Sequence, residues 1–204
     1  PLSTVLSSVY LLQKYTNTED QPKREKHIQR IISSVNLLTD ILNDFLSVGK
    51  IEEGKIQARY SRFDLKKNMT ETIAEMQSVS KAGQQIKYEH SGETEVELDP
   101  GMFKHISLNL LSNAIKFSPE NAVIEIHSAV TPTQIELRVK DSGIGISKED
   151  QAHLFERFFR ATNAINIQGT GLGLHIVSKY AELMNGRIFC KSEMEKGTEF
   201  TITF

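Results

Sequence analysis

Two asparagines and a lysine on one expected helix have the chemistry to hold a metal ion and a phosphate group. Asn109 and Asn113 stand four residues apart in the helical pattern of residues 100–117, and Lys116 follows three residues later, so the three share a face. Asparagine is mildly unfavourable inside a helix, but its amide oxygen suits Mg²⁺ and a lysine ammonium neutralises phosphate charge. Two solvated amides on an exposed face are the alternative, which the surrounding leucines and isoleucines disfavour.

A glycine-rich segment supplies a second place for phosphate. Glycine alternates with other residue types just before an expected helix, in the order Gly169, Thr170, Gly171, Leu172, Gly173 and Leu174. Glycines let a ligand approach the backbone closely, and the free N–H groups at a helix start favour an anion, most often phosphate. A flexible loop or a tight packing contact would show the same glycines, so this motif alone leaves three interpretations open.

A third motif ends an expected strand with a carboxylate and opens a loop. Asp141 is followed by Gly143 and Gly145. A carboxylate can accept a hydrogen bond from an exocyclic amine, and the glycines let a flat ring lie against the backbone. A simple turn is the alternative.

An aromatic and basic cluster precedes a polar stretch. Residues 155–160 contain three phenylalanines and two arginines, the second being Arg160, and residues 161–168 are mostly polar. This order predicts an anchored hinge followed by a mobile lid of about ten residues. A core cluster beside a loop is the alternative.

Helices and strands alternate after residue 55 and would position these motifs. We expect helices over 64–81, 100–117 and 171–184, and strands over 56–60, 85–90, 93–98, 123–130, 134–141, 187–192 and 199–204. The strands at 85–90 and 93–98 are expected to pair through a turn at Ser91 and Gly92, and those at 123–130 and 134–141 to form a hairpin around Pro132. The prediction is a mixed sheet with helices on one face, an α+β sandwich.

Two amphipathic helices precede this region. Apolar residues recur every three or four positions from Leu2 to Leu12 and again, as a heptad seam, from Ile28 to Phe45. Two helices cannot bury such long stripes against each other alone, so we predict a homodimer in which two hairpins form a four-helix bundle. Packing of the hairpin on its own chain is the alternative. The expected domains are a hairpin over 1–50, a linker over 51–62 and a second domain over 63–204, with a hinge at 49–54.

Composition excludes several classes of protein. The 204 residues are 39% hydrophobic and 25% charged, with a net charge of −2, which gives no electrostatic case for nucleic acid or an acidic membrane surface. One cysteine, Cys190, fits a reducing compartment and a plain buried thiol. We find no apolar run of membrane-spanning length and no signal peptide. The expectation is a cytoplasmic fragment without membrane contact, whatever anchors a longer parent protein.

The order of the four motifs resembles the ATP-binding domain of sensor histidine kinases. The motifs are Asn-x-x-x-Asn-Ala-x-Lys from Asn109, Asp-x-Gly-x-Gly from Asp141, Phe-x-Arg-Phe-Phe-Arg ending at Arg160, and Gly-Thr-Gly-Leu-Gly-Leu from Gly169. The likeness covers the whole chain, because the hairpin resembles the dimerisation and phosphoacceptor domain. In that family the catalytic fold is an α/β sandwich shared with ATP-driven chaperones and type II topoisomerases.

The resemblance implies a role for each motif. Asn113 would bind Mg²⁺ with help from Asn109, and Lys116 would meet the phosphates of ATP. Asp141 would recognise the adenine amine, with Gly143 and Gly145 beside the ring. Arg160 would contact a phosphate from the lid. Gly169, Gly171 and Gly173 would form the far hinge of the lid and the phosphate cradle. Thr198 would back the aspartate.

One departure from the chaperone-type relatives bears on the reaction. Those relatives hydrolyse ATP with a glutamate at the position of Asn109, and an amide cannot take a proton from water. Neutral imidazole already presents a lone pair. The residues therefore predict γ-phosphoryl transfer to a histidine. The resemblance implies relay from there to an aspartate of a response-regulator receiver domain. A non-catalytic dimeric nucleotide-binding scaffold is the rival, and an ATPase of the chaperone or topoisomerase type is disfavoured.

A second departure concerns the acceptor. The family motif reads approximately His-Glu-x-Arg-Thr-Pro-Leu, and this chain opens with Pro1 and Leu2, so the acceptor is expected five residues upstream of Pro1. The fragment is then expected to bind Mg²⁺ and ATP without phosphorylating itself. We expect His27 to be a solvated residue on a helix face. The other histidines are interpreted as structural, namely His90, His105, His127, His153 and His175.

Overall fold

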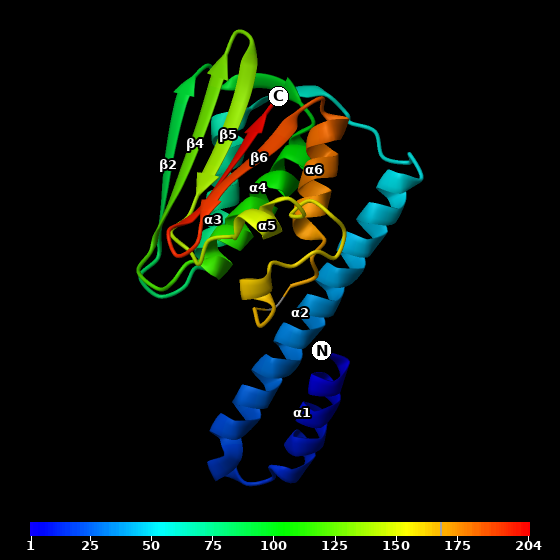
Figure 1. The fold of residues 1–204 in the computed structure, drawn as a ribbon. Helices are drawn as coiled ribbons and strands as arrows, with labels where there is room; N and C mark the ends of the chain where they lie inside the picture. The colour runs from blue at the N-terminus through cyan, green and yellow to red at the C-terminus, as the bar shows by residue number, and fades with distance from the viewer. Residues whose placement is uncertain (168) are drawn as a thin grey trace. The chain divides into compact units, whose positions relative to one another are not determined.

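The chain folds into two compact units, Pro1–Glu52 and Glu53–Phe204. The structure, a computed structural model, describes residues 1–167 and 169–204, without the side chain of residue 40 (Figure 1). The first unit is helical and the second combines helices with a sheet, so the predicted fold class, α+β, is confirmed.

The first unit is a helical hairpin. Helix α1 (Leu2–Lys14) packs along α2 (Gln21–Glu52), and a short 3₁₀ turn (Thr18–Asp20) joins them. Helix α2 runs through Gly49, so the break predicted at 49–54 begins only after Glu52, and Gly54 takes the positive φ of a chain turn.

Much of the apolar seam on the hairpin remains exposed. Leu2 is 71% exposed, Leu42 and Phe45 are each 56% exposed, and Val35 is 47% exposed. One hairpin therefore buries only part of its seam, as expected for two helices alone.

The length and hydropathy of helix α2 can be compared with the prediction that the chain has no membrane-spanning segment. Within residues 18–52, one 18-residue window reaches a mean hydropathy of 1.3, so by length and composition alone this helix could cross a membrane. Serine, asparagine and aspartate interrupt the apolar residues of this helix, so it contains no continuous apolar run of that length, and the expected absence of membrane contact stays a prediction. One such helix is a weak indication, since helices of soluble bundles pass the same test.

His27 is buried, which corrects the prediction of a solvated residue. Its side chain lies between the two helices, 7% exposed, with Nδ1 3.4 Å from the Ser8 hydroxyl. Its ring also stacks on Tyr15 with centroids 5.7 Å apart. The heptad pattern does not reveal this because it registers apolar residues only, whereas small serines leave room for an imidazole between helices.

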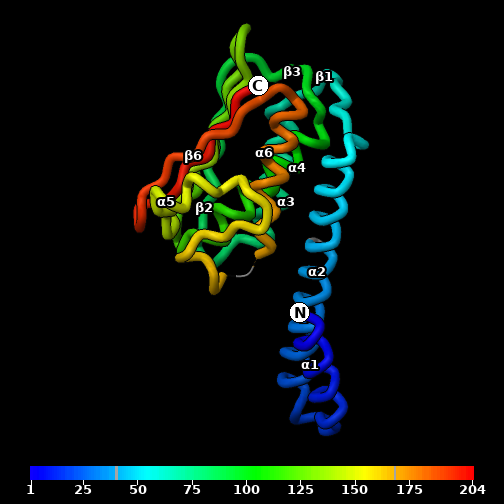
Figure 2. Tube along the Cα trace, turned by 45° about the vertical axis from the view of Figure 1, so that its right-hand side comes forward, coloured from blue at the N-terminus to red at the C-terminus, as the bar shows by residue number. Residues whose placement is uncertain are grey.

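The second unit is a five-stranded mixed sheet with helices on one face, as predicted (Figures 1 and 2). The strand order is β2-β4-β5-β7-β6, where β2 pairs with β4 in parallel and all other pairs are antiparallel. The strands are β2 (Gln85–Gly92), β4 (Val123–Thr131), β5 (Gln134–Lys140), β6 (Arg187–Glu193) and β7 (Gly197–Thr203). The helices are α3 (Leu65–Gln77), α4 (Pro100–Phe117), the short α5 (Lys148–Gln151) and α6 (Gly173–Leu183), with a 3₁₀ turn at Thr162–Ala164.

The predicted pairing of residues 85–90 with 93–98 is wrong. Strand β3 (Glu95–Leu98) pairs instead with β1 (Ser61–Asp64) in a separate two-stranded sheet, and residues 56–60 form no strand. Alternating residues predict that a strand exists but not its partner, because any neighbouring strand satisfies the same backbone groups.

Helix α4 lies at the centre of the core. Its side chains Phe103, Ile106, Leu110 and Leu111 are at most 1% exposed. Asp99 caps the helix, accepting at Oδ1 from the amides of Gly101 (2.9 Å) and Met102 (3.0 Å), and at Oδ2 from the Arg59 amide (2.7 Å). This cap fixes where the helix begins and hence which residues face away from the core.

We predict that Asp99→Ala costs about 2 kcal/mol of unfolding free energy, because it removes the acceptor for three amides. The matched variant Asp64→Ala removes a cap that accepts from one amide, that of Lys67, and is expected to cost about 1 kcal/mol. Chemical denaturation of both variants measures the difference, and an equal or smaller cost at Asp99 would contradict it.

Candidate functional site

Asn109 lies where α4 meets the start of α6. Its Nδ2 donates to the His105 carbonyl (3.1 Å), and no donor within the described residues contacts Oδ1, which can therefore accept from a ligand or bind a cation. A Cβ atom at Gly173 would lie 2.6 Å from that oxygen. Glycine at this position therefore lets α6 approach the amide without displacing it.

Asn113 lies one turn further along the same face. It is half-buried, and within residues 1–167 and 169–204 its amide makes no hydrogen bond. The same ranges contain no group of three His, Cys, Asp or Glu side chains that could hold a metal. The donors on this face are thus two amide oxygens, which fit Mg²⁺ only if phosphate and water complete its oxygen shell.

Lys116 adds a positive charge to the same face of α4. A Cβ atom at Gly169 would lie 2.7 Å from its Nζ, so the glycine-rich segment passes directly beside the ammonium group. Burial lowers the pKa of Lys116, and the nearby Arg160 charge lowers it further. An anion between these two cations would relieve both effects.

Arg160 lies near Lys116, but its guanidinium is occupied by hydrogen bonds to backbone carbonyls of the lid. Its Nη2 donates to the carbonyls of Ala164 (2.7 Å), Ile165 (2.9 Å) and Ile167, so the guanidinium holds the lid's own backbone. A phosphate contact from Arg160 stays a prediction, since some of these bonds would have to be exchanged. The lid was predicted over residues 161–168, of which residue 168 lies outside the described residues.

The start of α6 presents backbone N–H groups. Its N-cap, Leu172, provides no side-chain cap and is 2% exposed, which anchors the turn. The Thr170 hydroxyl accepts from the Leu172 amide at 3.0 Å, and Leu174 is half-buried in the first turn of the helix. At Gly171 φ is +73°, and a Cβ atom would lie 2.7 Å from the carbonyl carbon of Phe158. The segment is therefore a tight packing contact as well as an open helix start.

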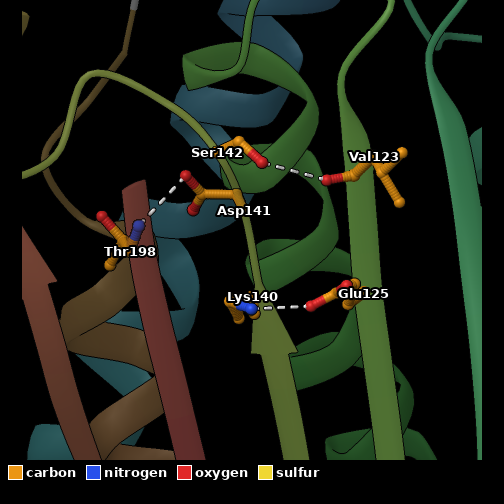
Figure 3. A network of polar contacts seen from close by, with 6 residues as sticks. All are labelled: Val123, Glu125, Lys140, Asp141, Ser142 and Thr198. Atoms are coloured by element: carbon orange, nitrogen blue, oxygen red, sulfur yellow. Dashed lines mark hydrogen bonds and ion pairs between the residues drawn. The ribbon is translucent and has the colours of Figure 1, made fainter. Parts of the chain in front are cut away.

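Asp141 stands directly after β5 and is tied to β7. Its Oδ1 accepts from the amides of Gly143 (2.8 Å) and Thr198 (3.3 Å), and its own amide donates to the Thr198 carbonyl at 2.8 Å (Figure 3). In the described part of the chain no donor contacts Oδ2. One carboxylate oxygen thus fixes the side chain while the other is left for a ligand.

Burial makes the ionised form of Asp141 less favourable. The side chain is 8% exposed, and burial raises its carboxyl pKa, while the Gly143 and Thr198 amides act in the opposite direction. An amine that donates to the carboxylate would stabilise its ionised form.

The glycines after Asp141 are required by the protein itself. A Cβ atom at Gly143 would lie 2.7 Å from the Phe117 carbonyl, and one at Gly145 would lie 2.0 Å from the Glu193 carbonyl. This loop is therefore pressed between α4 and β6. Contact of its backbone with a flat ring stays a prediction.

Two residues that support the loop escaped the sequence analysis. The Gln151 amide donates to the carbonyls of Ile146 (2.8 Å) and Ser192 (3.0 Å), and the Ser192 hydroxyl accepts from the Ile146 amide (2.9 Å). Neither stands in a recognisable motif, because a serine in a strand and a glutamine in a short helix are common.

Comparison with known proteins places this site in a family. Residues 98–204 match the family described as histidine kinase-, DNA gyrase B- and HSP90-like ATPase. Sensor histidine kinase GacS of Pseudomonas protegens is 33% identical over 100% of this chain and 23% of its own length. BarA of Escherichia coli K12 is 33% identical over 98% of the chain and 22% of its own length. The chain spans about a quarter of the length of these relatives.

Solved histidine kinases share the fold. Histidine kinase AdeS of Acinetobacter baumannii has a TM-score of 0.78 at 21% identity, covering 100% of this chain and 94% of its own. Full-length ShkA in complex with AMPPNP has a TM-score of 0.77 at 26% identity, covering 100% of this chain and 42% of its own. The structure of ThkA in complex with response regulator TrrA has a TM-score of 0.76 at 24% identity, covering 100% of this chain and 57% of that one.

We predict that Asp141→Asn weakens ATP binding about ten-fold or more while it stabilises the fold at pH 7. The amide presents a donor to the adenine amine where the carboxylate presents an acceptor. Because burial raises the pKa of Asp141, its ionised form destabilises the protein as pH rises through that pKa, and asparagine removes this penalty. Below the ordinary carboxyl pKa the stabilising effect should vanish.

Calorimetric titration with ATP and thermal unfolding at several pH values measure both effects. The control is Glu125→Gln, which neutralises an exposed carboxylate paired with Lys140 on the same sheet (Figure 3). Unchanged ATP affinity in Asp141→Asn would remove the adenine assignment.

Proposed function

Because this chain belongs to the family of histidine kinase-, DNA gyrase B- and HSP90-like ATPases, we propose that it is the kinase core of a protein that phosphorylates a histidine with ATP. In the full protein the phosphoryl group would pass on to an aspartate of a response regulator. The observation that carries this proposal is that the glycine-rich segment lies along α4, with Gly173 beside Asn109 and Gly169 beside Lys116. The match of residues 98–204 to this family and the homology of the chain to sensor kinases support the proposal.

Different residues of the candidate site would bind different parts of the nucleotide. Asp141 would bind the adenine amine, and the open start of α6 with Lys116 would hold the phosphates. Asn113 and Asn109 would hold Mg²⁺, which supplies charge stabilisation at the phosphates when bound. Arg160 would join them once the lid exchanges its carbonyl contacts.

The α4 sequence favours transfer to histidine over hydrolysis. Helix α4 contains no Asp or Glu, so it offers water no carboxylate as a general base, and the Asn109 amide is bound to the His105 carbonyl. The His105 ring itself packs against Tyr180. A neutral imidazole needs no base because its lone pair is already available. Catalysis would then rest on positioning and on charge stabilisation at the phosphates.

We propose that none of the six histidines of this chain is the acceptor. His27 is buried in the hairpin, His105 lies against Tyr180 with ring centroids 5.2 Å apart, and burial lowers the His105 pKa. His90 and His175 bind protein oxygens through their rings. The exposed His153 is paired with Glu156, and His127 lies on a sheet strand, so neither forms part of a helical acceptor site.

The test adds the missing motif. We predict that the chain incubated with Mg²⁺ and γ-labelled ATP acquires no acid-labile label, whereas the same chain extended by His-Glu-x-Arg-Thr ahead of Pro1 does. The controls are the extension with glutamine in place of the added histidine, and Asn113→Ala in the extended chain, both expected to lose the label. Equal acid-labile labelling of the unextended chain would contradict the prediction.

A nucleotide-binding scaffold is the alternative function. The exposed seam and an intact nucleotide site would serve it equally. An extended chain that binds ATP but stays unlabelled would favour the scaffold over the kinase.

We further propose that residues 1–52 form the dimerisation unit and that a second copy covers its exposed seam. Large apolar residues exposed in a row at heptad spacing mark an interaction surface. The relay partner would be a receiver domain, as in the complex of ThkA with TrrA. A cytoplasmic location for this part of the protein follows from that partnership and is part of the proposal.

We predict that the 204-residue chain sediments as a dimer and that Leu42→Lys raises its dimer dissociation constant about ten-fold or more, because the charge would be buried at the interface. The control is Asn43→Lys, at an exposed polar position of the same helix. Analytical ultracentrifugation gives both constants. A monomeric wild type, or equal effects of the two variants, would rule out this interface.

A further inference from the structure

The hydroxyl of Ser192 lies where the loop after Asp141 meets β6 and β7. It accepts from the Ile146 amide at 2.9 Å, donates to the Gly197 carbonyl at 2.8 Å, and lies 2.9 Å from the Thr198 hydroxyl. Ser192 and Thr198 are direct partners across the β6–β7 pair. One side chain therefore joins the loop, the turn and the strand that surround Asp141.

The single proton of Ser192 fixes the direction of this network. A carbonyl only accepts, so the Ser192 proton goes to Gly197, and the Ile146 amide can only donate to Ser192. The proton between the two hydroxyls must then come from Thr198. Ser192 is left with one donated and two accepted hydrogen bonds, which uses its full capacity.

This direction determines what Thr198 can offer a ligand. With its proton committed to Ser192, the Thr198 hydroxyl has only lone pairs left. Beside it, Asp141 uses Oδ1 for the Gly143 and Thr198 amides and keeps Oδ2 as a further acceptor. The Asp141 and Thr198 side chains therefore both present acceptors to a ligand.

We propose that Ser192 is a positioning residue that sets base preference: by holding Thr198 as an acceptor, it makes the site select a base with an exocyclic amine over one with a carbonyl at the same place. This inference rests on the proposed nucleotide-binding function. A carbonyl oxygen facing two acceptors leaves polar groups without partners, which is how a site built for hydrogen bonds rejects an analogue.

The experiment compares ATP with inosine triphosphate, which carries a carbonyl in place of the amine and a proton on N1. Equilibrium titration in the presence of Mg²⁺ should show the wild type preferring ATP about ten-fold or more, and Ser192→Ala reducing that preference to about three-fold or less. In Ser192→Ala the Thr198 hydroxyl is free to turn and donate to the carbonyl. Ser192→Thr keeps the hydroxyl and should restore the preference.

The matched control is Gln151→Ala. Gln151 supports the same loop through the carbonyls of Ile146 and Ser192, but it makes no contact with the Thr198 hydroxyl. Its loss should weaken both nucleotides by a similar factor and leave their ratio unchanged. Thr198→Val serves as a second test in case Ser192→Ala does not fold, and it should also lower the ratio.

Each outcome decides the proposal. An unchanged ratio in Ser192→Ala or in Thr198→Val overturns it, as does a Ser192→Thr variant that loses the ratio as fully as Ser192→Ala. In those cases ATP binding by the wild type keeps the proposed function intact. A wild type that binds neither nucleotide contradicts the proposed function and this inference together.

Discussion

The packing of α4 against the sheet, with α3 and α6 as its helical neighbours, is the constraint on which the site depends. The apolar side of this helix is excluded from water by Phe103, Ile106, Leu110 and Leu111, which fixes the rotation of the helix about its axis. The asparagines and the lysine then have to face the start of α6. Glycine at 173 and at 169 is the other half of the same constraint, because a Cβ atom there would displace the Asn109 amide or the Lys116 ammonium group from its present position.

At Asp141 the fold loses stability but keeps a group that can bind a ligand. A carboxylate at this depth loses hydration, and two backbone amides offset only part of that loss, since its pKa remains raised. The Asp141 carboxylate is therefore placed where hydrogen bonds from an amine could stabilise its negative charge. Arg160 shows a related balance, because its guanidinium is occupied by lid carbonyls and could exchange them for phosphate as the lid moves.

The positions of helices and strands could be predicted from the sequence better than the pairing of the strands. The cap at Asp99 and the period of α4 are local signals, so the helix that carries Asn109 and Asn113 could be placed within a residue. The pairing of β3 with β1 depends on contacts distant in sequence and was missed.

Side-chain networks were the least predictable feature. The burial of His27 depends on small residues of a facing helix, and the role of Ser192 depends on three segments that meet only in the fold. The family motifs located the candidate site because each combines unusual residue types at fixed spacing. The residues that support those motifs have no such signal.

One end of the second unit is proposed to hold Mg²⁺ and an adenine nucleotide. An amide NMR titration of the ¹⁵N-labelled 204-residue chain with Mg²⁺ and a non-hydrolysable ATP analogue tests this. We expect saturable shifts at Gly143, Thr198 and Gly169–Gly173, with the amides of α1 unaffected. Saturation that leaves these amides unchanged, or shifts confined to the hairpin, would contradict it.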